Sequence, residues 1–143
     1  MSSADYRYIE HVSDEMVEAY GRTLNEAFAN SAKALINIVC DVSKVDPGKH
    51  IAIQTTGFDL VSLLYGWLEK VLIALLVDNL ALAKFQVMIK RRKDYYFLTS
   101  ECEGEAFVRR KHQYKVEVKA ITYHEMKVTK SKGKFVVQYI VDL

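Results

Sequence analysis

The sequence predicts an α+β fold, with two helices packed on one face of a mostly antiparallel β-sheet, in a single domain of residues 1–143. Two segments have hydrophobic residues at helical spacing, and most of the other hydrophobic segments alternate with polar residues as half-buried strands do. Helices separated by runs of strands favour an α+β arrangement. An antiparallel sheet with both helices on one face leaves its other face open to water.

Length and composition describe an ordinary globular chain. It has 143 residues, of which 50% are hydrophobic and 27% charged, with one proline and six glycines. The formal net charge of +2 is too small to indicate nucleic-acid binding by itself. The charges are uneven, because Lys and Arg number 6 against 11 Asp and Glu up to Ala83, and 14 against 7 from Lys84 onward. This asymmetry indicates either a partner-facing surface or basic residues on the solvent face of strands.

The cysteines and the most apolar segment indicate where the protein acts. Cys40 and Cys102 are too few for a disulfide scaffold or a zinc finger, so we expect a reducing, cytoplasmic location. The apolar run over residues 60–77 carries Glu69 and Lys70 near its middle, where charges are costly in lipid. We therefore expect a buried helix there and no membrane partner.

Both helices are predicted from local capping signals. Thr23 and Glu26 fit a capping box, in which the Thr23 hydroxyl accepts from the Glu26 amide and the Glu26 carboxylate reaches back to the Thr23 amide. The helix that follows is expected from Leu24 to about Val39. Asp59 is a suitable N-cap for a second helix with a wide apolar face.

Strands are predicted before, between and after the helices, with about six of them from Lys84 onward. The predicted strands are residues 6–12, 15–20, 50–55, 85–89, 95–102, 105–111, 114–120, 121–128 and 135–141. Residues 131–134 (Ser-Lys-Gly-Lys) form a hairpin-like turn between the last two.

No catalytic residue is predicted, because the chain lacks a phosphate-binding glycine loop, a nucleophile elbow, HExxH and CxxC. Two places carry unusual polar residues. His11 and Asp14 lie at a strand end, where a turn with Asp14 bonded to nearby amides is the simpler interpretation. Asp142 and the terminal carboxylate of Leu143 come together directly after an apolar strand. Two such carboxylates repel each other unless a cation or basic group lies between them, and oxygen ligands suit Ca²⁺, Mg²⁺ or Mn²⁺.

Other functions remain open at this point. Tyr95, Phe97 and Arg109 could form a stacking platform for RNA on a basic sheet. A chaperone-like adaptor would hold its partner through exposed apolar surface. A metal-dependent hydrolase fits poorly, since no His or Lys base is placed by a motif.

Five segments resemble blocks of the archease family, and they come in the family's order over nearly the whole chain. Residues 8–14 (YIEHVSD) resemble its HTAD opening, with Val-Ser in place of Thr-Ala. The other four are residues 18–28 (EAYGRTLNEAF), 59–64 (DLVSLL), 118–124 (VKAITYH) and the ending 141–143 (VDL).

This resemblance implies an accessory function. Archeases are cofactors of the RtcB-type tRNA ligase, which joins tRNA halves during tRNA splicing. They promote guanylylation of a ligase histidine by GTP and so support multiple turnover, without being ligases themselves. The implied partner is therefore an RtcB-type RNA ligase, and tRNA would be contacted only indirectly through it.

The resemblance also implies a divalent metal site, with calcium expected first and magnesium or manganese as alternatives. Its ligands would be Asp14, Asp142 and the Leu143 carboxylate, and the residues facing the partner or supporting the ligands would be His11, His124 and Lys119. If Asp14 and Asp142 meet in space, three carboxylates converge, and holding a cation explains such a cluster most simply. Our hypothesis is that this acidic end enters the ligase active site and positions metal ions or the nucleotide there.

Overall fold

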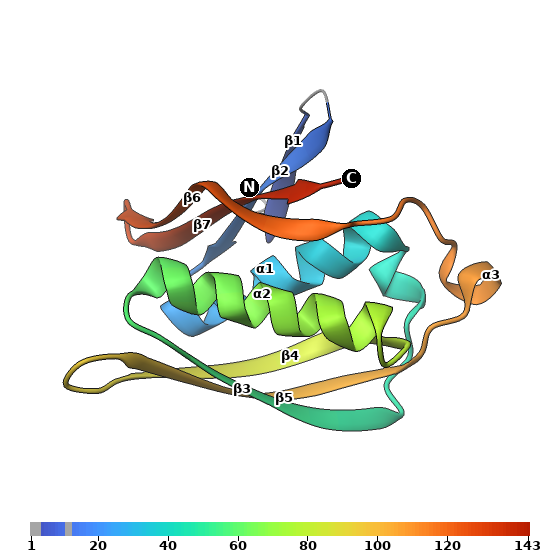
Figure 1. Cartoon of the computed structure of the whole chain (residues 1–143), viewed down its shortest axis with the longest axis horizontal. Helices are drawn as coiled ribbons and strands as arrows, with labels where there is room; N and C mark the ends of the chain where they lie inside the picture. The colour runs from blue at the N-terminus through green and yellow to red at the C-terminus, as the bar shows by residue number, and fades with distance from the viewer. Residues whose placement is uncertain (1–3, 11–12) are drawn as a thin grey trace.

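The computed structural model describes residues 4–10 and 13–143 (Figure 1). The elements in chain order are β1 (Tyr6–Glu10), β2 (Asp14–Gly21), α1 (Leu24–Val39), the 3₁₀ helix η1 (Val42–Lys44), β3 (Lys49–Gly57), α2 (Leu60–Leu76), β4 (Leu80–Arg91), β5 (Tyr96–Ala106), α3 (Arg109–His112), β6 (Ala120–Ser131) and β7 (Lys134–Asp142).

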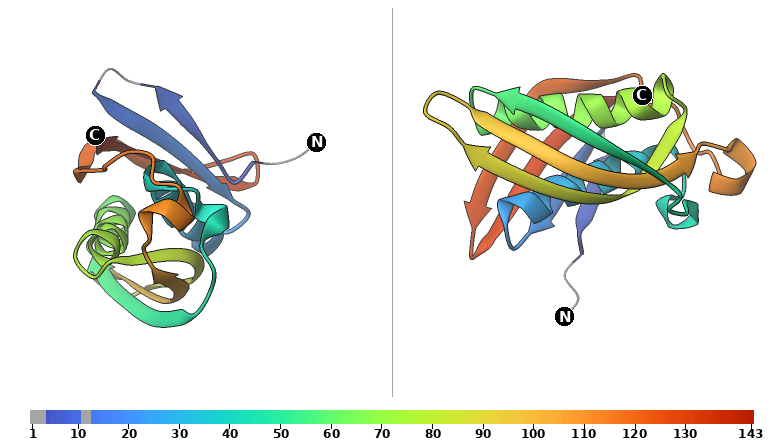
Figure 2. Two further views of the ribbon diagram at one scale, coloured as in Figure 1. Left: turned by 90° about the vertical axis from the view of Figure 1, so that its right-hand side faces the viewer. Right: turned by 90° about the horizontal axis from the view of Figure 1, so that it is seen from below.

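The strands form two antiparallel sheets, with α1 and α2 in a layer between them (Figures 1 and 2). One sheet has the order β1-β2-β7-β6 and the other β3-β5-β4. The predicted α+β class and antiparallel pairing are confirmed, but the expected single sheet is wrong. Each helix contacts strands of both sheets, because α1 packs on β2 and β4 and α2 packs on β3 and β6. One sheet would have left half of this apolar helix surface in water.

The helices begin where their capping residues predict. The Thr23 hydroxyl accepts a hydrogen bond from the Glu26 amide at 3.1 Å, but the Glu26 carboxylate accepts from the Arg22 amide at 2.9 Å rather than from Thr23. At the start of α2 the capping box is complete, since Asp59 and Ser62 each accept from the other's amide. Local polar residues therefore determine both helix starts.

The core lies along the helix layer and contains two large side chains whose polar atoms are satisfied. Trp67 is fully buried, and its indole N–H donates to the Phe28 carbonyl at 2.9 Å. Tyr139 of β7 is also fully buried, and its hydroxyl donates to the Ser31 carbonyl at 2.8 Å. Each bond ties α1 to another element, so the orientation of α1 is specified by polar as well as apolar contacts.

Two of the predicted strands are wrong. β5 ends at Ala106, and residues 109–112 form a single helical turn, α3, where a strand over 105–111 was expected. Residues 114–119 are not a strand, since β6 begins only at Ala120. Four strands therefore follow α2, rather than about six.

The side chain of His112 explains the position of α3. It is fully buried, its Nδ1 accepts from the Val108 amide at 2.9 Å, and its Nε2 lies 2.7 Å from the Glu105 carboxylate. The main-chain carbonyl of His112 also accepts a hydrogen bond from the Asp41 amide at 2.8 Å. These contacts with other segments hold residues 107–112 against the domain in a form that alternation alone does not predict.

The predicted turn between β6 and β7 is confirmed as a two-residue hairpin loop. Lys132 and Gly133 both have positive φ, at 50° and 78°, as the tight hairpin turn with two left-handed residues requires. Among the described residues, no helix has both the length and the apolar character needed to cross a bilayer.

Candidate metal centre

Asp14 and Asp142 lie directly opposite each other in the antiparallel pair of β2 and β7. Ala120 of β6 lies opposite Asp142 on the other side of β7. Side chains of directly opposed residues project from the same face of a sheet, with their Cβ atoms about 4.5–5.5 Å apart. The C-terminal end of the chain thus comes to lie beside the start of β2 (Figure 1). We call Asp14 and Asp142 the acidic pair.

The acidic pair lies on the face of the sheet that is turned away from the helices. Along the two strands, Val17 and Val141 belong to the buried core against the helix layer. Since successive side chains alternate between faces, Asp14 and Asp142 project from the outer face. Asp142 is exposed, whereas Asp14 is half-buried.

An apolar row borders the acidic pair on this outer face. The next opposed pair of these strands on the same face is Met16 with Ile140, and both side chains are buried, with Ile140 only 1% exposed. A low-polarity neighbour strengthens electrostatic interactions, both the repulsion within the acidic pair and the attraction of a cation to it.

Two contacts hold the last residues of β7 in place. The side chain of Leu143 is partly buried and packs against the core. The Lys119 amide donates to the Asp142 carbonyl at 2.8 Å. The structure therefore brings the three predicted ligands, Asp14, Asp142 and the Leu143 carboxylate, to one end of one sheet.

The residues predicted to face a partner are distributed differently. Lys119 is exposed and lies next to the acidic pair through its bond to Asp142. His124 lies farther along β6, with its side chain 75% exposed and its Nε2 3.3 Å from the Glu125 carboxylate. His11 lies outside the described residues. Only Lys119 of these three is placed at the acidic pair by the structure.

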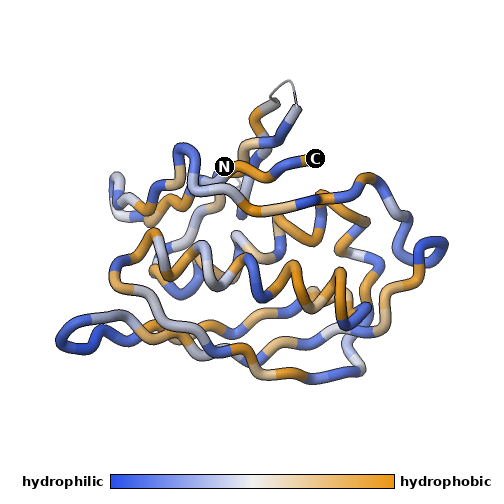
Figure 3. Tube along the Cα trace, in the orientation of Figure 1, coloured by the Kyte–Doolittle hydropathy of each residue, from blue (hydrophilic) through white to orange (hydrophobic). Residues whose placement is uncertain are grey.

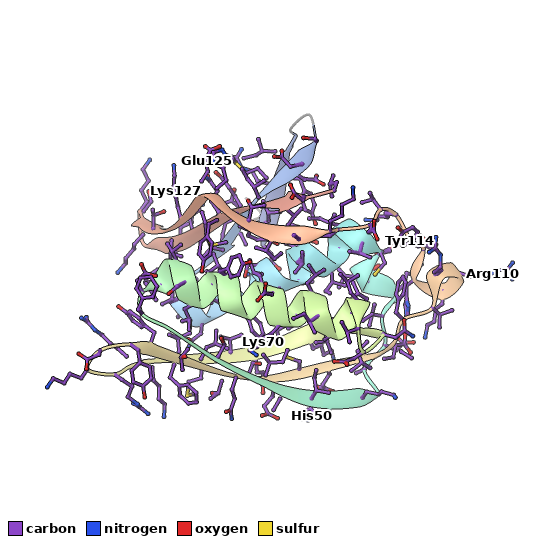
Figure 4. The ribbon with its side chains drawn as sticks, in the orientation of Figure 1. His50, Lys70, Arg110, Tyr114, Glu125 and Lys127 are labelled. Atoms are coloured by element: carbon purple, nitrogen blue, oxygen red, sulfur yellow. The ribbon has the colours of Figure 1, made fainter. Side chains whose placement is uncertain are left out.

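An irregular stretch of β6 was missed by sequence reasoning. The pairing of β6 with β7 is interrupted between Thr122 and Lys127, and Glu125 has a positive φ of 53°. The Gln138 side chain donates to the Glu125 carbonyl at 2.8 Å, which holds this bulge in shape. Figure 4 shows Glu125 and Lys127 on the side of β6 away from α2. In the sequence, the break in apolar and polar alternation at residues 123–126 (Tyr-His-Glu-Met) is the signal that could have revealed it.

The three predicted ligands, Asp14, Asp142 and the Leu143 carboxylate, fit a hard divalent cation, since all three are carboxylates. No set of three His, Cys, Asp or Glu side chains within residues 4–10 and 13–143 gathers closely enough to hold a metal. The predicted site takes the Leu143 carboxylate as its third ligand. Both cysteines are buried, and burial raises the pKa of the Cys40 thiol to about 11. A buried, protonated thiol is neither a nucleophile nor a metal ligand.

Tyr95 and Arg109 do not come together in the RNA platform that was one alternative for Tyr95, Phe97 and Arg109. Tyr95 lies in the loop between β4 and β5, whereas Arg109 lies in α3, beyond the opposite end of β5. Arg109 instead places its guanidinium 4.0 Å from the ring centroid of Tyr114. The excess of basic residues in the second half of the sequence therefore does not predict which of them share a surface.

Comparison with known proteins gives one consistent family. Residues 6–143 match the profile of the Archease protein family (MTH1598/TM1083). Protein archease from Sulfurisphaera tokodaii is 36% identical over 138 residues, which cover 96% of this chain and 98% of the relative. Protein archease from Pyrococcus furiosus is 37% identical over 139 residues, which again cover 96% of this chain and 98% of the relative.

Solved structures agree with this similarity. The solution structure of protein 1598 from Methanobacterium thermoautotrophicum superposes with a TM-score of 0.84 at 32% identity, over 97% of this chain and 99% of that chain. A crystal structure from Thermotoga maritima is described as an archease and possible chaperone. It superposes with a TM-score of 0.56 at 17% identity, over 100% of this chain and 98% of that chain, and supports the fold alone. With a matching profile over nearly its whole length and relatives above one-third identity, the chain belongs to the archease family.

Proposed function

We propose that this protein is an accessory factor of an RtcB-type tRNA-splicing ligase, which it activates by promoting guanylylation of the ligase by GTP and multiple turnover. The observation that carries the proposal is the direct opposition of Asp14 and Asp142 in a chain of the archease family. In this proposal the protein is not itself an enzyme. In splicing, the ligase binds the tRNA, and this protein contacts the ligase.

The metal in this proposal would be held by Asp14, Asp142 and the carboxylate of Leu143, with calcium as the first expectation and magnesium or manganese as alternatives. A divalent cation bound there would supply neutralisation of phosphate charge during nucleotidyl transfer. Cross-strand like charges destabilise a sheet, so a pair of aspartates at this position favours a ligand that offsets their repulsion.

The contribution of the chain itself is a rigid support for these ligands. β7 lies between β2 and β6, so Asp142 is hydrogen-bonded on a central strand rather than on a loose terminus. The Lys119 amide and the packed Leu143 side chain fix Asp142 and Leu143, the two residues that follow Val141. Ligands held by a sheet in this way need little reordering when they meet a metal or a partner.

The two buried free thiols fit a reducing compartment, and we place this activity in the cytoplasm. No described residue of this chain is required to perform the bond-forming step, which belongs to the ligase.

The experiment is a ligation assay with limiting ligase, excess split tRNA and GTP, in which product per ligase molecule is measured. We expect wild-type protein to raise the yield well above one product per ligase, and Asp142→Asn to abolish this increase. The matched control is Asp78→Asn, which removes an exposed carboxylate just after α2 that makes no ion pair among the described residues. Full activation by Asp142→Asn, or by protein extended beyond Leu143, would contradict the proposal.

A chaperone-like adaptor is the second candidate, because apolar side chains are exposed near the end of α2. Leu76 and Val77 are 51% and 73% exposed, and Val108 nearby is 49% exposed. The Phe107 amide bonds to the Asn79 carbonyl and so brings these segments together. Suppression of the aggregation of an unrelated client would favour this function, and double replacement Leu76→Ser with Val77→Ser would then remove it.

A further inference from the structure

The hairpin between β4 and β5 ends in four consecutive cations, Lys90 to Lys93 (Lys-Arg-Arg-Lys). All four are exposed, and no carboxylate of the described chain lies within ion-pair distance of any of them. Asp94 is the one acidic residue in the loop that follows. The hairpin extends past the helix layer, at the end of the molecule opposite to the C-terminus (Figures 1 and 2), and Figure 3 shows its end as strongly hydrophilic. We call residues 90–95 the β4–β5 tip.

Hydrogen bonds and a cation–π contact hold the backbone of this tip in one conformation. The Arg92 amide donates to the Tyr95 carbonyl at 2.7 Å, directly beyond the last strand pair, Arg91 with Tyr96. The guanidinium of Arg91 lies 5.8 Å from the ring centroid of Tyr96, within the range of a cation–π contact. The hydrogen-bonded turn therefore presents its cations from a rigid hairpin.

Two exposed aromatic rings lie at this end of the three-stranded sheet, one in the tip and one beside it. Tyr95 is 44% exposed. Phe58 is 78% exposed, an unusual environment for a large apolar side chain, and it follows Gly57, which pairs with Tyr96 at the base of the tip. The four cations and the two exposed rings are thus gathered at one end of the three-stranded sheet.

We propose that the β4–β5 tip binds single-stranded RNA directly, with its cations on the phosphates and the rings of Tyr95 and Phe58 stacked on bases. Proteins bind single strands through this combination of a basic track and aromatic stacking surfaces, which tolerates any sequence. Duplex RNA hides its base faces, so the rings would contribute nothing to duplex binding. This surface goes beyond the ligase-mediated contact with tRNA proposed above and does not depend on the acidic pair.

An anionic membrane is the other surface that attracts basic and aromatic residues together. Interfacial binding needs a contiguous apolar face to enter the lipid. Residues 90–94 are five successive exposed charged residues, and the exposed rings beside them are two, those of Tyr95 and Phe58. The observations therefore favour RNA.

The test measures fluorescence anisotropy of a labelled 12-nucleotide oligouridylate with the full chain at several salt concentrations. The tip variant is Arg92→Glu with Lys93→Glu. Its matched control is Lys127→Glu with Lys132→Glu, which makes the same change in net charge on or beside β6, at two exposed lysines without ion pairs among the described residues. We expect the tip variant to bind at least tenfold more weakly and the control less than threefold. The slope of log affinity against log salt should fall by about 1.4 in the tip variant, since each phosphate contact on a single strand contributes about 0.7.

The stacking contribution is tested separately with Tyr95→Ala. We expect an affinity loss of about fivefold or more with an unchanged salt slope, since stacking on one base accounts for a loss of this size. Equal losses in the tip and control variants would overturn the proposal, because they would indicate net charge alone. Affinity for a duplex equal to that for the single strand, or binding to phosphatidylserine vesicles without binding to RNA, would overturn it as well.

Discussion

Asp14, the first residue of β2, and Asp142, the last residue of β7, are opposed across one antiparallel strand pair, so the two ends of the chain present two carboxylates on the same face. Like charges at directly opposed positions destabilise a sheet. Neither residue is needed for the hydrophobic core, which is built from the alternate positions of both strands. The proposed function gives the acidic pair a role in binding a cation, which the core does not require.

Replacing Asp142 with Asn should raise the stability of the metal-free protein. The change removes a cross-strand repulsion, so we expect the free energy of unfolding in chelator to increase by up to about 1 kcal/mol. Calcium at 100 times its dissociation constant should stabilise the wild type by about 2.7 kcal/mol and the variant by much less. Urea denaturation with EDTA and with calcium measures both effects. An Asp142→Asn protein stabilised by calcium as strongly as Asp78→Asn would contradict the metal site.

The buried hydroxyl of Tyr139 should contribute measurably to stability. Tyr139→Phe leaves the Ser31 carbonyl without this donor inside the core, and we expect the free energy of unfolding to fall by about 1–2 kcal/mol at pH 7. Chemical denaturation at neutral pH measures the loss. A Tyr139→Phe protein as stable as the wild type would show that the hydroxyl bond is offset elsewhere.

The same hydroxyl gives a signed prediction at high pH. Burial raises the pKa of Tyr139 well above its usual value of 10, so the folded protein keeps it neutral. Its contribution to stability is fully present below pH 10 and is lost as pH rises from 10 toward the folded pKa. The wild type should therefore lose stability more steeply than Tyr139→Phe above pH 10. Parallel alkaline curves for the two proteins would contradict this role.

Glu105 should make the fold sensitive to acid. The Asp46 amide, His112 and Lys111 bind its carboxylate and lower its pKa from 4.5 to about 2. A lowered pKa means that the contribution is present above pH 4.5 and is lost as pH falls toward 2. Glu105→Gln should be less stable than the wild type at pH 7, with a difference that shrinks between pH 4.5 and 2. A difference independent of pH in denaturation curves would indicate lost packing instead.

A glycine in β5 should not tolerate a side chain. A Cβ added at Gly104 would collide with the main-chain carbonyl of Ala81, next to the irregular pairing of β4 at Leu82 and Lys84. Neither atom can move without shifting a strand, so Gly104→Ala should cost about 1–3 kcal/mol. Gly48→Ala is the control, because its added Cβ would meet only an ordinary contact with the Gly104 carbonyl. Equal unfolding midpoints for the two variants would contradict the close approach.

The parts of the fold that depend on local signals could be predicted from the sequence. Thr23 and Asp59 marked the starts of both helices, because a cap is made within four residues. The division into two sheets could not be predicted, since it depends on which distant strands pair. The segment at 109–112 was predicted as a strand and is a helix because His112 is bound by Glu105 and Asp41, contacts that no periodicity reports.

The candidate site shows the same division. The residue types of Asp14 and Asp142 could be singled out from their places at strand ends and from the family resemblance. Their direct opposition required the register of β2 on β7, which the buried alternate residues of both strands specify once the strands are paired. The bulge at 123–126 displaces His124 from a regular strand position, and its supporting bond from Gln138 links segments whose contact the sequence does not predict.

The most direct measurement of the central claim is the rate at which an RtcB-type ligase becomes covalently guanylylated by labelled GTP. The assay is run with the ligase alone, with the wild-type chain and with Asp142→Asn, all in the presence of divalent metal. The account predicts a large increase in rate with the wild type and none with Asp142→Asn. An equal rate in all three reactions, or equal activation by both proteins, would contradict it.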